Sequence, residues 1–310
     1  MKPKRWAGML LLVWLLFSCS YRKIMINDVV DMAEFALNRF ENEYYDLKLM
    51  EQAAPANLVN LEALLANDPA NQRMLVFLAK AYFSYTYAIE EVRWESILIA
   101  DAADRDAEEH PAELKNQVSL HYRKGMDYAL KALAIQHPDC EASLGNVRTA
   151  LDFIKSLTIE DVPALFWYGM NLSAYINLNQ DSVKAVSQLH LATKAMERVL
   201  ELDPSYYYGC AHLALMTIYS SMPPMLGGNP ERSLHHYREQ QKIAGEDFLL
   251  LDLHYARYYL YQKQDREEYV HVLNHILERS KKHSERYVLF NQIAALRAAV
   301  YLKATDGLFN

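Results

Sequence analysis

The stretch that decides the fold is ATKAMERVLELDPSYYYGCAHLALMT, residues 192–217. Its first half carries apolar residues at spacings of three and four, including Ala192 and Met196, which is typical of one face of an α-helix. Pro204 ends that helix, because proline lacks the amide proton that a helix interior needs. A second apolar series with the same spacing starts at Cys210. The stretch therefore predicts two helices joined by a short turn.

The same geometry occurs earlier in the chain. Both segments place the first pattern residue six positions after a proline: Leu75, Leu78, Ala79 and Tyr82 follow Pro69 as Cys210, Leu213, Ala214 and Thr217 follow Pro204. Small residues such as Ala79 and Ala214 let two antiparallel helices approach closely. The pattern resembles a degenerate tetratricopeptide (TPR) repeat. A generic helical hairpin is the alternative, and the Leu-Asp-Pro turn with its upstream spacing favours the repeat.

Helical patterns fill the remaining windows, and none alternates like a β-strand. Only nine Gly and ten Pro interrupt the chain, which favours long helices and short turns. Helix ends are predicted at Pro55, Pro69, Pro111, Pro138, Pro163, Pro204 and Pro223-Pro224. Thr158 to Asp161 resembles a capping box before the helix that Pro163 opens. We expect an all-α, TPR-like solenoid of helical hairpins with about thirteen helices.

Residues 1–18 are typical of a secretory signal peptide. Lys2, Lys4 and Arg5 precede an apolar run that is too short to span a bilayer of about 30 Å. The ending Leu16-Phe17-Ser18-Cys19 resembles a bacterial lipobox, so Cys19 is the expected lipidation site, with an ordinary signal peptide as the alternative. Ser20 fits retention in the outer membrane. No Pro/Gly/Ser-rich linker divides residues 19–310, which we treat as one domain.

Composition limits the possible partners. Hydrophobic residues make up 52% of the chain and charged residues 23%, so a sizeable core is available. The net charge is −7, and residues 1–19 carry +3, which leaves −10 on the rest. Such an acidic surface repels phosphate backbones, so nucleic-acid binding is not expected.

Two predicted helical stretches carry no charged residue, residues 162–180 and, His212 aside, residues 205–230. A surface helix usually has a charged face, so both should be surrounded by protein. Asn171, Asn177 and His212 need polar partners if they are buried, and a wet central cleft would supply them. A filled core is the alternative. The candidate ligand-cleft residues are Trp167, Tyr168, Asn171, Tyr175, Tyr208, His212, Met216 and Tyr219.

A search for catalytic chemistry finds no nucleophile elbow, P-loop, dinucleotide fingerprint or zinc-binding helix motif. The pairs His235/Glu239 and His271/His275 supply two metal ligands each, which is too few for a site. Cys210 and His212 point in different directions on one helix and cannot form a nucleophilic pair. Whether Cys140 and Cys210 form a disulfide stays open. We expect no catalytic residue, metal or cofactor.

From Asn57 to the C-terminus the chain resembles the T component of TPR-protein-associated TRAP transporters, the TatT family. The matching segments, in order, are Asn57-Leu58 with Glu62, Asp68 to Asn71, Leu78 to Tyr82, Ala164 to Tyr168, Val199 to Pro204, Met222 to Glu231, His236-Tyr237, Tyr255 to Tyr259, Gln264 to Arg266, Asn291 to Ala294, and Arg297-Ala298. The lipoprotein start also matches. Ser233 stands where the family usually has Ala.

The resemblance implies a helical lipoprotein that faces the periplasm, forms a homotrimer and has a pore or cleft through each protomer. It further implies docking to the periplasmic solute-binding P component and transfer of a small, apolar ligand. The candidate partner-loop residues are Pro223, Pro224, Gly227, Gly228 and Asn229. Two alternatives from other classes are a scaffold lipoprotein of the cell envelope and an unrecognised helical hydrolase or metalloenzyme.

Overall fold

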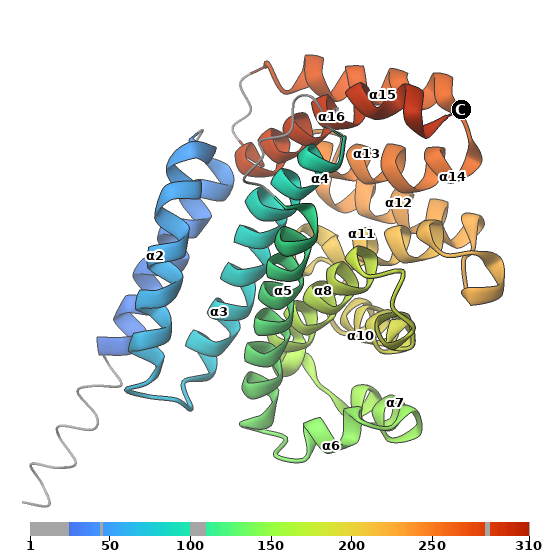
Figure 1. Ribbon diagram of the computed structural model, residues 1–310. Helices are drawn as coiled ribbons and strands as arrows, with labels where there is room; N and C mark the ends of the chain where they lie inside the picture. The colour runs from blue at the N-terminus through green and yellow to red at the C-terminus, as the bar shows by residue number, and fades with distance from the viewer. Residues whose placement is uncertain (1–24, 44–45, 100–109, 283–285, 310) are drawn as a thin grey trace, which may run out of the picture.

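The structure, a computed structural model, describes residues 25–43, 46–99, 110–282 and 286–309. Within these ranges the regular elements are all helical, which confirms the all-α class (Figure 1). They are a helix over residues 25–42, α2 (Leu47–Leu65), α3 (Gln72–Tyr85), η1 (Thr86–Glu90), α4 (Glu91–Ile99), α5 (Pro111–Ala134), α6 (Cys140–Leu144), α7 (Val147–Ser156), η2 (Ile159–Asp161), α8 (Val162–Leu178), α9 (Val183–Val186), α10 (Leu189–Leu202), α11 (Tyr206–Ser221), η3 (Pro224–Leu226), α12 (Pro230–Ala244), α13 (Leu249–His254), η4 (Tyr255–Leu260), α14 (Tyr261–Lys263), α15 (Arg266–Arg279) and α16 (Val288–Leu308).

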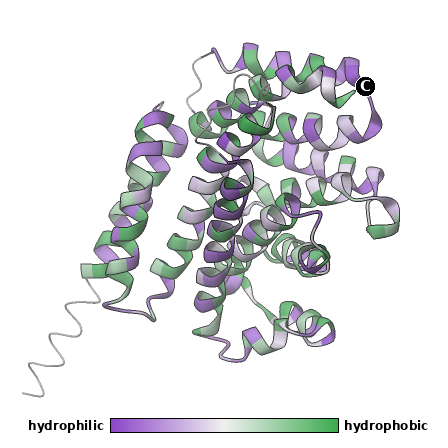
Figure 2. Cartoon of the chain, in the orientation of Figure 1, coloured by the Kyte–Doolittle hydropathy of each residue, from purple (hydrophilic) through white to green (hydrophobic). Residues whose placement is uncertain are grey.

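Local capping chemistry sets many of the helix starts. The side chains of Asn71 and Asn229 accept amide hydrogen bonds at the starts of α3 and α12. The predicted capping box is confirmed: Thr158 and Asp161 bond reciprocally at η2, directly before α8. Most helices carry hydrophilic and hydrophobic residues on the same ribbon, as expected for elements that are half buried (Figure 2).

The predicted helix end at Pro55 is wrong. Helix α2 runs through this residue without a break. Pro55 and Glu51 are both exposed, so the Glu51 carbonyl that proline leaves without an amide donor faces water. Hydration of this carbonyl therefore offsets most of the free-energy cost that the missing hydrogen bond would have in a buried helix.

Consecutive long helices pack side by side through the body of the protein. Helix α3 packs on α5, α5 on α8, α8 on α10, and α11 on α12 (Figure 1). The C-terminal helix α16 then packs against both α15 and α4. The last helix thus returns to the first half of the chain, and the helices enclose a central region instead of forming an open row.

The helical parts of the two charge-free stretches lie in this central region, as predicted, but residues 223–227 at the end of the second stretch are exposed, against the prediction. Helix α8 is buried on most of its faces, and so is α11 after its first turn. Asn171 on α8 is fully buried and donates to the backbone carbonyl of Ala79 on α3, 3.2 Å away. That bond requires close approach of α3 and α8, which the small Ala79 side chain permits.

Helix α11 begins with a left-handed turn that the sequence did not predict. Tyr207, Tyr208 and Gly209 have φ values of 46°, 62° and 71°. A left-handed conformation costs roughly 1–2 kcal/mol for each residue other than glycine. Aromatic packing offsets this cost, because the Tyr207 ring lies 4.8 Å from Trp167 and 6.0 Å from Phe290.

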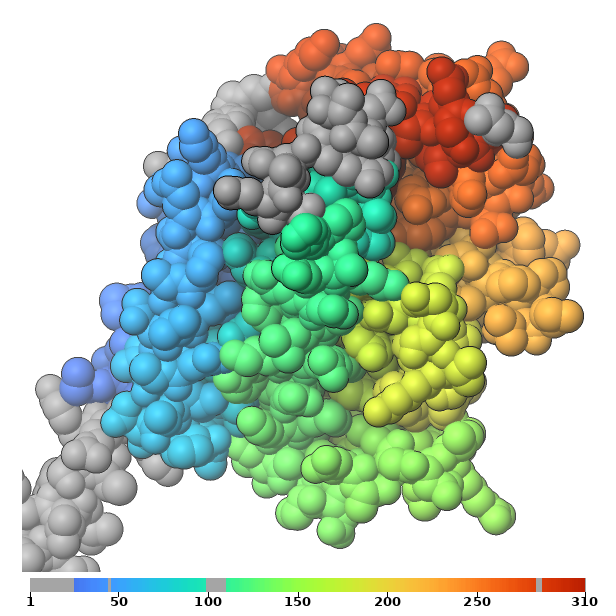
Figure 3. Space-filling model, in the orientation of Figure 1, coloured from blue at the N-terminus to red at the C-terminus, as the bar shows by residue number. Residues whose placement is uncertain are grey.

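The helix over residues 25–42 and α2 lie side by side on the outside of α3. The carboxylate of Glu62 on α2 accepts hydrogen bonds from Tyr82 of α3 and from Lys124 and Tyr128 of α5. In the space-filling view the blue surface of α2 adjoins the green surface of α5 (Figure 3). We call the helix over residues 25–42 together with α2 the N-terminal hairpin.

Candidate functional site

A polar cavity of about 320 Å³, here called the vestibule, opens between α4, α8 and η4. Its wall includes Trp94 and Glu95 of α4, Lys115 of α5, Asp181 after α8 and Arg257 of η4. The Lys115 ammonium lies 3.1 Å from the Asp181 carboxylate. The vestibule is therefore a charged hollow in which most side chains already have protein partners.

The vestibule adjoins an apolar inner cavity of about 60 Å³. Met170 and Ile176 of α8 and Leu213 and Ile218 of α11 line it. A further apolar cavity of about 50 Å³, the deep cavity, shares part of this wall and also has Tyr207 of the left-handed turn at its side. Both are large enough to hold several water-sized groups, each of which needs about 10–15 Å³.

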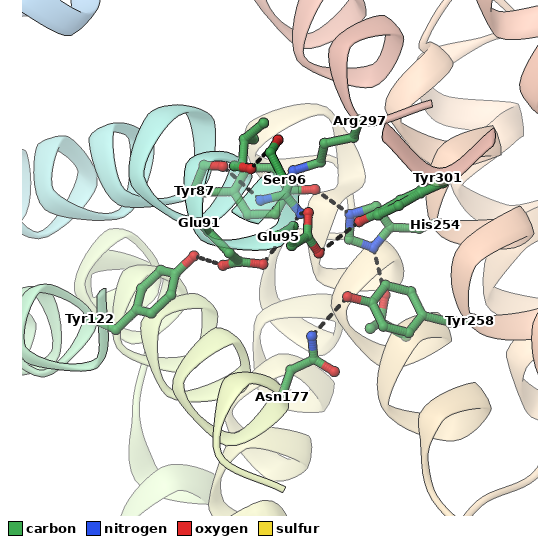
Figure 4. Close-up of polar contacts among 12 residues, drawn as sticks. Tyr87, Glu91, Glu95, Ser96, Tyr122, Asn177, His254, Tyr258, Arg297 and Tyr301 are labelled. Carbon is green, nitrogen blue, oxygen red and sulfur yellow. Dashed lines mark hydrogen bonds and ion pairs between the residues drawn. The ribbon is translucent and has the colours of Figure 1, made fainter. Parts of the chain in front are cut away.

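Four residues line both the vestibule and the inner cavity: Glu91, Asn177, Ser221 and Tyr258. The Asn177 amide donates to the Tyr258 hydroxyl across 2.8 Å, joining α8 to η4 (Figure 4). This hydrogen bond stands at the boundary between the polar and the apolar space. We call Asn177 and Tyr258 the latch.

A buried ionic cluster lies beside the latch and ties α16 to α4. One guanidinium nitrogen of Arg297 lies 3.3 Å from Glu91 and 3.6 Å from Glu95 (Figure 4). Glu91 also accepts a hydrogen bond from Tyr122, and Glu95 accepts one from Tyr301 at 2.9 Å. Burial raises the pKa of Glu91. Burial alone would lower the pKa of Arg297, but the neighbouring carboxylates raise it and keep the group charged.

A neutral histidine forms another part of the wall. Thr217 donates its hydroxyl proton to the Leu213 carbonyl, so its oxygen must accept from Nδ1–H of His254, 2.8 Å away. The other ring nitrogen of His254 then accepts from the Tyr87 hydroxyl at 2.7 Å. Burial lowers the pKa of His254 to about 3, which agrees with this neutral tautomer.

Both π-helical turns of the described chain border these cavities. Tyr87 lies in η1 and Tyr258 in η4, and each lines the inner cavity. A wider turn displaces a backbone carbonyl from its usual helical bond. In η1 the Tyr87 carbonyl accepts a 2.8 Å hydrogen bond from Arg297 of α16. The irregular turn therefore supplies an acceptor to the ionic cluster.

The N-terminal hairpin encloses a fourth space, an apolar groove of about 430 Å³ against α3. Leu37 and Phe40 of the first helix, Leu58 and Leu61 of α2, and Phe77 of α3 are among its lining residues. Ser84 lines both this groove and the deep cavity. The four spaces thus follow one another from the vestibule to the N-terminal hairpin.

Comparison with known proteins identifies the family. Residues 43–309 match the family model described as TRAP transporter T-component. The chain belongs to this family. It is also 26% identical over 204 residues to a protein of Treponema pallidum (strain Nichols) described only as an uncharacterized protein. That match covers 65% of this chain and 61% of the relative, so the chain spans less than two thirds of the relative's length.

Membership relates this chain to the T-components of TRAP transporters. Among the described helices, none has both the length and the apolar character needed to cross a bilayer. The described ranges also contain no group of three or more His, Cys, Asp or Glu side chains placed to hold a metal. Cys140 and Cys210 are both buried and free, which answers the question of a disulfide between them.

The structure places the eight candidate cleft residues next to the cavities and not on their walls. None of Trp167, Tyr168, Asn171, Tyr175, Tyr208, His212, Met216 and Tyr219 is among the residues that line the four spaces described above. Trp167, Asn171 and Met216 are fully buried in the core. His212 instead faces His236, with 2.8 Å between their Nδ1 atoms. Ligand contact by any of the eight stays a prediction.

Other faces of the same two helices line the inner cavity. Met170 and Asn177 of α8 and Leu213 and Thr217 of α11 are on its wall. Sequence reasoning selected the charge-free helices and then favoured their aromatic residues. Choosing the right face would have required knowing that α11 packs on η4 and that Asn177 of α8 reaches Tyr258 of η4, which no local pattern indicates.

The partner-loop candidates lie on an exposed turn between α11 and α12. Pro223 precedes η3, and Asn229 caps α12. Gly227 has a φ of 97°, while at Gly228 an added Cβ would overlap the carbonyl oxygen of Met222. Between these residues, Met225 is 89% exposed and Leu226 50% exposed. The loop therefore has a fixed shape and presents two apolar side chains to solvent.

Proposed function

We propose that this protein is a lipid-anchored, periplasm-facing accessory component of a TRAP transporter that docks the solute-binding protein and passes a small apolar ligand through its internal cavities. The observation that supports this proposal is that the polar vestibule lies directly beside two apolar cavities and shares wall residues with the inner one. Apolar surface removed from water contributes about 25 cal/mol per Å². An apolar solute would therefore move from the vestibule into the inner cavity spontaneously.

Entry requires the latch to open. The hydrogen bond between Asn177 and Tyr258 joins two helices at the mouth of the inner cavity. A neutral hydrogen bond contributes about 1 kcal/mol net, so thermal motion breaks it often. We infer that the latch slows exchange of the ligand with water without blocking it.

Docking is assigned to the loop between α11 and α12. Isolated apolar side chains on a rigid loop are effective contact points, because little conformational entropy is lost when they become buried. Met225 and Leu226 meet this description. The solute-binding protein would place its ligand cleft near this loop.

Co-purification with the solute-binding protein tests the docking step. We expect Met225→Ser to weaken capture of the partner by about tenfold, since it removes an exposed apolar contact. Val183→Ser is the matched control, because Val183 is 86% exposed but lies on α9. Equal capture by both variants would remove the loop from the proposal. Capture of envelope-assembly proteins in place of the solute-binding protein would favour the scaffold function.

The anchor and the trimer are further parts of the proposal. Cys19 and the signal peptide fall outside the described residues. Mass spectrometry of the mature N-terminus would detect acylation of Cys19, and light scattering of the purified protein would measure its oligomeric state. An unmodified N-terminus would remove the anchor, and a monomer would remove the trimer.

A further inference from the structure

Arg257 is the one arginine on the vestibule wall. Three tyrosine rings surround its guanidinium, Tyr258, Tyr261 and Tyr301, with centroids 5.4 to 5.6 Å away. It makes no hydrogen bond or ion pair of ordinary length with the residues that the structure describes. An arginine carries five N–H donors and stays charged at any physiological pH. The aromatic rings stabilise the charge but leave these donors without acceptors.

The acidic side chains around Arg257 already have other partners. Asp181 pairs with Lys115 at 3.1 Å. Glu95 accepts from Tyr301 and pairs with Arg297, and Glu91 accepts from Tyr122 and also pairs with Arg297. Burial lowers the pKa of Arg257. The neighbouring tyrosines and the negative charge of Glu95 raise this pKa by more, so the guanidinium stays charged. Two arginines thus balance the charges of Glu91 and Glu95, while the hydrogen bonds of both glutamates come from Tyr122, Tyr301 and Arg297 and not from Arg257.

The space next to Arg257 has a polar end and an apolar end. The vestibule holds most of the charged groups, and the inner cavity behind the latch exposes a mainly apolar surface. The inner and deep cavities measure about 60 and 50 Å³. At about 10–15 Å³ per water-sized group, they accept roughly eight such groups. A ligand that fits both ends has a charged head and a short alkyl tail.

We propose that the vestibule binds the head group of an amphipathic carboxylate through Arg257, with the alkyl tail in the inner and deep cavities. A guanidinium donates two parallel hydrogen bonds to a carboxylate, a geometry that an ammonium does not offer. The inference rests on the proposed function, because it names the class of ligand that the cavities accept. It differs from that proposal in requiring a negative charge on the ligand.

Titration calorimetry with sodium octanoate tests the head-group site. The full-length protein is titrated in detergent, and each variant is compared at the same detergent concentration so that partition of the probe cancels. We expect Arg257→Gln to weaken octanoate binding by about tenfold or more, since it removes charge-assisted hydrogen bonds. Binding of 1-octanol, which has the same tail and no charge, should be equal in both proteins.

Arg266→Gln is the matched control, because it removes the same charge from an exposed pair with Asp306. It should leave octanoate binding unchanged. If Arg257→Gln does not fold, Arg257→Lys keeps the charge without the planar fork and should bind octanoate at an intermediate affinity. Comparing octanoate with octylamine on the unmodified protein needs no variant, and octanoate should bind more tightly.

Three results would overturn the inference: no octanoate binding, equal binding by Arg257→Gln, or tighter binding of octylamine. These measurements use the T-component alone. Failure of the carboxylate site would therefore leave co-purification with the solute-binding protein intact. Failure of docking would leave the calorimetry unchanged, so the two proposals can be rejected separately.

Discussion

Among single residues, Arg297 has the largest expected effect on stability. It is 1% exposed and faces Glu91 and Glu95. We expect Arg297→Leu to lower the free energy of unfolding by about 3–5 kcal/mol, because it leaves two buried carboxylates without a counter-charge. Urea denaturation followed by circular dichroism measures this loss.

The control for that prediction is an exposed ion pair. Arg266→Leu breaks the contact with Asp306, whose side chain is 93% exposed, and should cost less than about 1 kcal/mol. Adding Glu91→Gln to Arg297→Leu should recover part of the stability. Similar losses for the two arginine variants would show that the buried cluster is not acting through its charges.

Three buried histidines predict a loss of stability in mild acid. Burial lowers the pKa of His254 to about 3 and those of His212 and His236 to about 4. Between about pH 6.5 and 4 the unfolded chain binds protons that the folded chain does not. The free energy of unfolding should therefore fall as pH falls, by up to about 1.4 kcal/mol per pH unit for each histidine.

Urea denaturation at several values between about pH 7.5 and 4.5 measures this slope. The variant His254→Gln keeps a donor and an acceptor but does not titrate. In this variant the free energy of unfolding should change less steeply with pH, by up to about 1.4 kcal/mol per pH unit, because one titrating histidine is removed. A slope that stays the same in this variant would mean that other groups cause the acid sensitivity.

At the scale of elements, the sequence predicted that the chain is helical and where many helices begin and end. It did not predict the irregular turns within the helices. The capping box at Thr158 and the burial of α8 followed from local residue patterns. The π-helical turns η1 and η4 did not, because neither contains a glycine or proline that would mark an irregular turn, and contacts with α16 and α11 hold the wider turns in place. The predicted helix end at Pro55 was wrong because a local pattern does not show whether a proline is exposed to water. At an exposed position the carbonyl that the proline leaves unbonded is solvated, and the helix continues.

The loop between α11 and α12 provides a prediction at this scale. We expect Gly228→Val to change the loop, because its Cβ would overlap the Met222 carbonyl, while α11 and α12 keep their helicity. Binding to the solute-binding protein should weaken by more than the helical signal drops. Gly307→Ala, at an exposed position with open space, is the control and should leave both unchanged. Unaltered partner binding by Gly228→Val would contradict the docking assignment.

At the scale of the whole molecule, the N-terminal hairpin is attached less tightly than the central helices. An open apolar groove of about 430 Å³ separates much of it from α3. Regions with little packed contact open at a lower free energy than the core. Hydrogen exchange followed by mass spectrometry should show faster exchange in the two helices of this hairpin than in α5, α8 and α11. Equal protection of the hairpin and α8 would contradict this expectation.

The cavities themselves were the part of the molecule that sequence reasoning placed least well. The charge-free helices indicated where the chain is buried, and both do border the inner cavity. Arg257, Asn177 and Tyr258 meet only because η4 packs beside α8 and α4, more than eighty residues away in the chain. Such contacts depend on which helices pack against one another in the folded chain, and a local stretch of sequence does not contain that information.

The contact between Glu91 and Arg297 spans 206 residues, and it has a consequence for how the protein folds. Helix α16 follows the other described helices in the chain, so those helices hold two glutamates with no arginine to meet them until α16 docks. Closing so long a loop also carries a large entropic cost, and non-local contacts of this kind form slowly. The interior therefore closes only when α16 docks, and a chain that lacks this helix leaves two glutamates without a counter-charge inside.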